Sequence, residues 1–241
     1  MVMSFPVAAQ TSANAPSVPA ISAAAILKKS CDAGGSEEAR NAVRTLHITG
    51  YLEGPDRRGA LNFEYFADAS GKFVYELEYS GITDRSGFDG KKFWHTATAK
   101  SFPLLQPPDL PGTDSDLPVA ESPLACSLRR NVKDARVMGK ANVGGDEAVV
   151  VLLTDPHGNK QAVYIDTKTW LLVRSDGAVV HMQQNEKAGR AYTIYLSDYR
   201  SIAGIKIPFR KHQVTGAGET WEIKSKVEVN HEIDPRKFLH G

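Results

Sequence analysis

The sequence lacks a charge excess, a long hydrophobic run and a large set of cysteines. Lysine and arginine total 29, against 28 aspartate and glutamate residues. This balance gives no strong field that would draw the chain to nucleic acid or to an anionic membrane surface. No run of about 18 consecutive apolar residues occurs, so we expect no transmembrane segment. These absences leave a globular, non-nucleic-acid-binding protein as the expected class.

Recognisable catalytic motifs are absent as well. There is no G-x-S-x-G nucleophile elbow and no phosphate-binding loop. His231-Glu232 begins like the zinc motif H-E-x-x-H, but Pro235 stands where the second histidine belongs. The seven histidines are scattered, without two at metal-ligand spacing. We therefore expect no catalytic residue, no metal and no cofactor.

Two cysteines are present, Cys31 and Cys126. Their separation of about 95 residues gives no geometric evidence for a bridge. A disulfide and two separate, partly buried thiols therefore both stay open from the sequence.

The N-terminus resembles the end of an export signal. No lysine or arginine precedes Lys28, and Val7-Ala8-Ala9 has the small residues of a signal-peptidase site. A stretch rich in Pro, Ser and Ala follows, but a charged start and most of an apolar segment are missing. Residues 1–20 are thus either a signal-peptide remnant with a disordered leader or a flexible cytosolic tail. We favour export.

Residues 21–44 carry the strongest helical pattern. Ser22 is placed to cap a helix that reaches residue 33, and Gly34-Gly35 is expected to end it. Ser36 is placed to cap a second, short helix. Ser122-Pro123 predicts another short helix over 123–131, after a connection at 101–121 whose five prolines exclude a central strand.

From Arg44 onward the apolar pattern changes to period two. About a dozen such segments follow, joined mostly by short turns that contain Gly, Asp, Asn or Pro. This predicts a mainly β fold, a meandering antiparallel sheet that is strongly curved or partly closed to hide its apolar face. Residues 21–241 are expected to form one domain, with 101–121 as an insertion.

Large apolar side chains recur on the period-two segments. A plain core accounts for many of them, but a sheet of this size with few helices would also leave an apolar concavity. From alternation alone we predict that such a cavity is lined by Phe63, Tyr65, Phe73, Tyr75, Leu77, Trp94, Trp221 and Ile223.

The run DYRSIAGIKIPFR at 198–210 has two interpretations. Asp198, Tyr199 and Arg200 could bind an anion at a strand end. Alternatively, Gly204 permits a hairpin turn, Tyr199 is a half-buried ring with its hydroxyl at the rim, and Pro208 sits at an edge or bulge. We favour the hairpin.

Five runs carry a family resemblance: CDAGGSEEARNAVRTLHITGYLEG, FDGKKFW, YIDTKTWLLVRS, SDYRSIAGIKIPFR and WEIKSKVEVNHEIDPRKF. They resemble exported bacterial proteins of the LolA/LolB/RseB-like superfamily, above all its outer-membrane lipoprotein-sorting-type domains. The resemblance spans roughly residues 25–239. It implies an incomplete, half β-barrel of about eleven antiparallel strands with covering helices. The proline-rich insertion at 101–121 departs from the lipoprotein chaperones.

In the carriers of this superfamily the cavity holds acyl chains, and the helices act as a lid. The resemblance therefore implies a periplasmic carrier that binds a lipid or an acylated protein, with the helices at 22–33 and 123–131 as candidate lids. A second hypothesis is an envelope sensor or scaffold of the same fold that binds another protein. A third is a small hydrolase without a recognisable motif.

Overall fold

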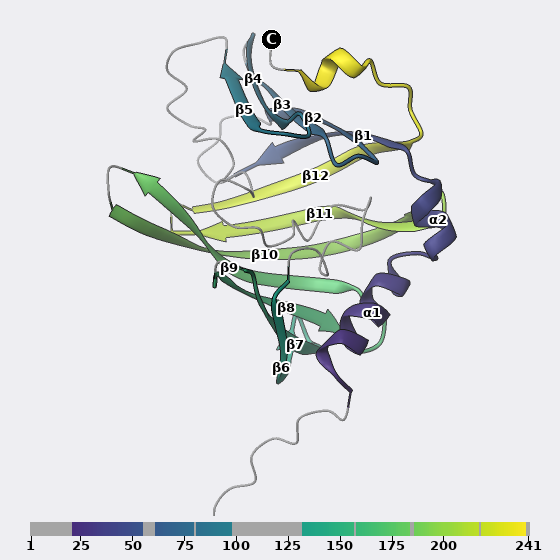
Figure 1. Ribbon diagram of the computed structural model, residues 1–241, viewed down its shortest axis with the longest axis vertical. Coiled ribbons are helices and arrows are strands. Elements are labelled where there is room, and N and C mark those ends of the chain that lie inside the picture. Colours follow the sequence, from purple (N-terminus) through teal and green to yellow (C-terminus); the bar gives the residue numbers. More distant parts are fainter. Residues whose placement is uncertain are drawn as a thin grey trace, which may run out of the picture.

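The computed structural model describes residues 21–54, 61–79, 81–97, 132–156, 158–183, 186–216 and 218–239 (Figure 1). The predicted leader at 1–20, the proline-rich connection at 101–121, the predicted helix at 123–131 and Cys126 lie outside these residues. Within the described ranges, no helix has the length and hydropathy that crossing a membrane requires.

One sheet of twelve strands dominates the fold. Its spatial order is β5-β4-β3-β2-β1-β12-β11-β10-β9-β8-β7-β6, and every neighbouring pair is antiparallel. The strands are β1 (Thr45–Glu53), β2 (Leu61–Asp68), β3 (Phe73–Tyr79), β4 (Ile82–Phe88), β5 (Phe93–Ala97), β6 (Asp134–Val143), β7 (Asp146–Thr154), β8 (Lys160–Asp166), β9 (Leu172–Gln183), β10 (Glu186–Ile202), β11 (Ile205–Thr215) and β12 (Gly218–Val229). The described sheet is curved and stays open between β5 and β6, which confirms the half-barrel with one strand more than the resemblance implied (Figure 1).

Two helices lie along one margin of the sheet (Figure 1). Helix α1 (Ala23–Ala33) is capped by Ser22, whose hydroxyl accepts from the Ala25 amide at 3.2 Å. Helix α2 (Glu37–Ala42) is capped in the same way by Ser36. The predicted helix–GG–helix order is confirmed, although Gly35, with φ +143°, and not Gly34 takes the positive φ.

The helices define an inner and an outer face of the sheet. Residues opposite each other on paired antiparallel strands point to the same face, so the register assigns each side chain. On the inner face, α1 packs on an apolar cluster over β7–β10, and α2 packs on a second one over β1–β3 and β11. On the outer face, a third cluster joins β2, β3 and β5 to the C-terminal 3₁₀ helix η2 (Pro235–Phe238).

The run at 198–210 is a hairpin corner, as expected. Strands β10 and β11 pair through Ile202 and Ile205, and the two turn residues Ala203 and Gly204 have φ of 47° and 81°. Positive φ at both central residues is the signature of the tight hairpin turn that matches strand twist. The half-buried Tyr199 donates its hydroxyl to the Leu172 carbonyl at 2.6 Å.

Pro208 lies in β11, which is a central strand, but at a point where that strand is paired on one side only. The register of β11 with β12 begins only at Arg210, so the stretch around Pro208 pairs with β10 alone. The missing N–H therefore removes no bond of the β11–β12 ladder.

Candidate functional site

An aromatic array occupies the inner face of β2 and β3. Phe63 lies opposite Leu77, Tyr65 opposite Tyr75, and Ala67 opposite Phe73. The rings are also in diagonal contact, with centroids 5.3 Å apart for Phe63 and Tyr75 and 6.1 Å apart for Tyr65 and Phe73. Five of the eight residues predicted to line a cavity thus share one surface, which we call the aromatic array: Phe63, Tyr65, Phe73, Tyr75 and Leu77.

The array grades from buried to half-buried side chains. Phe63 and Leu77 are buried, whereas Tyr65, Phe73 and Tyr75 are half-buried. Gly50 on β1 makes room for the Phe63 ring, because a Cβ atom there would lie 2.6 Å from Cε1 of that ring. The array is therefore built by a strand glycine as well as by the rings themselves.

Three charged side chains lie beside the array on the inner face, and we call them the charge triad: Lys211 on β11 and Glu222 and Lys224 on β12. Lys224 Nζ lies 3.0 Å from Glu222 Oε1, and Lys211 Nζ lies 3.6 Å from Glu222 Oε2. Their side chains are only 6%, 11% and 18% exposed for Lys224, Glu222 and Lys211. Gly50 of β1 is the cross-strand partner of both Phe63 on β2 and Lys224 on β12. Only this glycine therefore separates the aromatic ring from the triad.

The triad keeps its carboxylate ionised. Burial alone raises the pKa of the Glu222 carboxyl, but the ammonium groups of Lys224 and Lys211 outweigh burial and lower that pKa to about 2. A buried ion pair contributes little to stability compared with an apolar replacement, because both charges must be desolvated.

The other three predicted residues do not face the array. Trp94 opposes Gly87 on the outer face and packs there with Phe66, Val74 and Phe238. Trp221 is 37% exposed on the same outer face, where its ring stacks on His212 at 3.9 Å. Ile223, two residues along β12 from Trp221, pairs with the outward-facing Tyr51. The prediction that Trp94, Trp221 and Ile223 line the inner cavity is therefore corrected.

A β-bulge explains the error in β12. Thr49 pairs with Lys226 and the next residue, Gly50, pairs with Lys224, so Ser225 is an extra residue. The bulge reverses the alternation, since Val227 and Val229 point inward while Trp221 and Ile223 point outward. The same reversal places Glu222 and Lys224 inward, opposite Leu52 and Gly50 of β1.

Specific contacts join the two helices to each other and α1 to the turn between β8 and β9. Arg40 of α2 donates to the carbonyl of Cys31 at 2.8 Å and to that of Gly35, which joins the two helices across their break. Lys29 of α1 lies over the Trp170 ring, 4.3 Å from its centroid. Cys31 of α1 is disulfide-bonded and has no free thiol. The lid role of α1 stays a prediction.

No protein-family model matches the chain, and no curated protein matches it by sequence. Among solved structures, a DUF1329 family protein from Desulfovibrio piger has a TM-score of 0.54 at 12% identity, over 90% of this chain and 97% of its own. A LolA superfamily protein from Nitrosomonas europaea has a TM-score of 0.53 at 11% identity, over 92% of this chain and 99% of its own. At these identities the likeness shows the fold alone, which is the open half-barrel of the LolA superfamily.

Proposed function

We propose that this LolA-like half-barrel is a periplasmic carrier that binds the acyl chain of a lipid or of an acylated protein on its inner face. It holds and releases this ligand without a catalytic step of its own. The family resemblance of the sequence and the shared fold support the acyl-chain ligand, and the N-terminal pattern supports export.

The observation that carries the proposal is the adjacency of the aromatic array and the charge triad. An amphiphile has a long apolar part and a polar end, and these two surfaces offer a partner to each. Half-buried rings such as Tyr65 and Tyr75 gain free energy when a hydrocarbon chain covers them, at about 0.8 kcal/mol per buried methylene group. Lys211 and Lys224 lie where a polar or anionic end would meet them.

The test is native mass spectrometry of the full chain purified from an exporting host, followed by solvent extraction of bound material. We expect a co-purified amphiphile and, after its removal, uptake of added fatty acid or phospholipid. A ligand-free mass together with no uptake of either lipid would refute the carrier.

Paired variants locate the binding face. Tyr75→Ala removes a half-buried ring of the array, and Trp221→Ala removes a partly exposed ring of the outer face. Loss of the contact area of one ring weakens binding about tenfold or more. We expect this loss for Tyr75→Ala and wild-type uptake for Trp221→Ala, both checked for native circular dichroism. Equal loss in the two variants would place the ligand elsewhere.

One observation favours the alternative, an envelope sensor or scaffold that binds another protein. Strand β6 ends the described sheet and carries Met138, a large apolar side chain that is 58% exposed. A strand with one unpaired edge can accept a further strand from a partner, although the β-bulge at Met138 interrupts the regular ladder of β6. Two results together would favour this alternative over the carrier. The protein would bind a peptide without lipid, and Met138→Pro would abolish that binding. The wild-type protein would also take up no lipid.

A further inference from the structure

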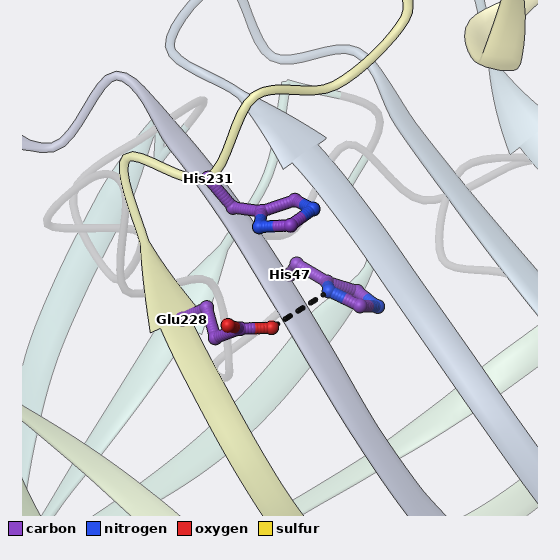
Figure 2. Close-up of side chains that lie close together, drawn as sticks. All are labelled: His47, Glu228 and His231. Atoms are coloured by element: carbon purple, nitrogen blue, oxygen red, sulfur yellow. Dashed lines mark hydrogen bonds and ion pairs between the residues drawn. The ribbon is translucent and has the colours of Figure 1, made fainter.

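Three potential metal ligands converge on the outer face, where the proposed carrier function has no role for them. His47 comes from β1, Glu228 from β12, and His231 from the segment that follows β12 (Figure 2). One ligand atom from each lies within 4.8 Å of the other two. His47 Nδ1 and Glu228 Oε2 are already 3.2 Å apart.

Strand pairing and backbone anchors hold these residues in place. His47 and Glu228 are direct cross-strand partners. The His47 ring lies flat on Phe66, with centroids 4.5 Å apart and planes at 4°. The segment that carries His231 is fixed to the start of β1, because Thr45 Oγ1 donates to the His231 carbonyl at 2.5 Å. A site whose ligands are positioned by rigid strands needs little reorganisation to bind.

Glu64 on β2 completes the arrangement from the other side of His47. Its Oε2 lies 3.4 Å from His47 Nε2, close but without hydrogen-bond geometry, and this buried nitrogen has no other hydrogen-bond partner among the described residues. A carboxylate that accepts from one nitrogen of a metal-binding histidine orients the ring and leaves the other nitrogen's lone pair for the metal, and the half-exposed Glu64 is close enough to take this role after a small side-chain movement. His47 Nδ1 and Glu228 Oε2 lie within hydrogen-bond distance of each other, and a metal ion would take the place of the proton between them.

We propose that His47, Glu228 and His231 form a binding site for a divalent transition metal of the zinc type, with Glu64 as the positioning residue of His47. Two imidazoles and one carboxylate are a donor set that Zn²⁺ accepts, with a fourth position for water. Glu228 binds through Oε2 only, since Lys226 Nζ occupies its Oε1 at 2.8 Å.

The geometry requires one small adjustment. Ligand atoms around a tetrahedral zinc ion are about 3.4 Å apart, given bond lengths near 2.0–2.1 Å. The three ligand atoms lie within 4.8 Å of one another, and the exposed His231 is the ligand whose side chain is free to rotate towards the other two. Lys226 adds a nearby positive charge, which limits the affinity.

Occupation of this site would tie the C-terminal segment to β1. His231 leads directly into η2, whose Phe238 completes the outer apolar cluster. A metal bound by both strands and this segment in the folded state alone therefore stabilises the fold.

The test is titration of the chelator-treated full chain with Zn²⁺, followed by calorimetry and thermal unfolding. We expect one Zn²⁺ per chain and a rise in Tm that Mg²⁺ does not produce. His231→Ala removes an exposed ligand and should weaken binding tenfold or more, as should Glu228→Gln. The control His212→Ala removes a histidine of the same face that pairs with Glu219 instead, and should bind like wild type.

Replacement of Zn²⁺ by Co²⁺ adds a readout that does not depend on stability. The visible absorption of bound Co²⁺ should appear in the wild type and disappear in His231→Ala. Equal Zn²⁺ affinity in wild type and His231→Ala, or an equal loss in His212→Ala, would overturn the site.

Discussion

Gly35 and Ile205 form an isolated antiparallel bridge between the helix break and the first residue of β11. Next to it, the Lys206 amide donates to the Gly34 carbonyl at 2.7 Å. The GG break therefore ends α1 and also docks the helices on the β10–β11 hairpin. The approach is close, since a Cβ atom on Gly35 would lie 2.8 Å from the Gly204 carbonyl oxygen.

The first prediction is that Gly35→Ala destabilises the fold by about 2–3 kcal/mol, because it adds a backbone clash to an unfavourable positive φ. Urea unfolding measures this change. The matched control is Gly139→Ala, since Gly139 has a similar φ of +132° but nothing within 4 Å of the added Cβ. We expect the control to cost about 1 kcal/mol. Equal effects of the two substitutions would mean that the docking contact contributes nothing.

The two helices and the turn between β10 and β11 were predictable from the sequence, because the signals that specify them are local. A serine before each helix specifies its N-terminal cap, and a glycine after α1 specifies its end. Ala203-Gly204 between two alternating segments specifies a turn. None of these signals depends on the rest of the chain. The strands followed from period two, and the half-barrel from the number of strands and the family resemblance.

The site was only partly predictable, because its remaining features depend on strand register. Nothing around Ser225 announces the bulge that turns Trp221 outward and Glu222 inward. Gly50 was the one available signal, since a glycine inside a strand often marks a bulge or a close approach. His47 and His231 are far apart in the sequence, and only the pairing of β1 with β12 brings them together.

The second prediction concerns the C-terminal segment on the outer face. Phe238 is buried against Trp94, and its carbonyl accepts from the Trp94 indole at 3.2 Å. Phe238→Ala leaves a cavity and should lower the free energy of unfolding by about 3 kcal/mol. The neighbouring Leu239 is 55% exposed, so Leu239→Ala should change it by less than about 0.5 kcal/mol. Urea unfolding of both variants checks this, and similar values would show that η2 does not pack as described.

The third prediction is a pH dependence from the charge triad. The pKa of Glu222 is lowered from an ordinary 4.5 to about 2. A lowered pKa in the folded state contributes stability above pH 4.5, and this contribution is lost as the pH falls towards 2. The shift corresponds to about 3 kcal/mol. Glu222→Gln, which also leaves two lysines buried without their carboxylate, should therefore be strongly destabilised at pH 7.

The difference between wild type and Glu222→Gln should shrink as the pH is lowered from about 4.5 to 2, because the wild-type carboxyl then protonates. Denaturant unfolding at a series of pH values measures it. Glu219→Gln is the control, since Glu219 is 53% exposed and pairs only with His212 among the contacts described. A difference that stays constant over this pH range would rule out an ionised, ion-paired Glu222.

The fourth prediction concerns the partner of Cys31, which the sequence left open. Cys31 is disulfide-bonded, and Cys126 is the one other cysteine in the chain. We expect the unfolded, unreduced monomer to take up no alkylating reagent and the reduced chain to take up two equivalents. A bridge that closes a loop of about 95 residues stabilises by about 4–5 kcal/mol, so reduction should lower Tm markedly. Reductant should have no such effect on Cys31→Ser.

Alkylation of both cysteines in the unreduced protein would contradict the bridge. The same measurement bears on the compartment, because structural disulfides persist in oxidising environments and are rare in the cytosol. Protein isolated from its native cells with the bridge intact, trapped by alkylation at the moment of lysis, would therefore support export. Reduced cysteines under the same trapping would argue for a cytosolic chain and against the periplasmic carrier.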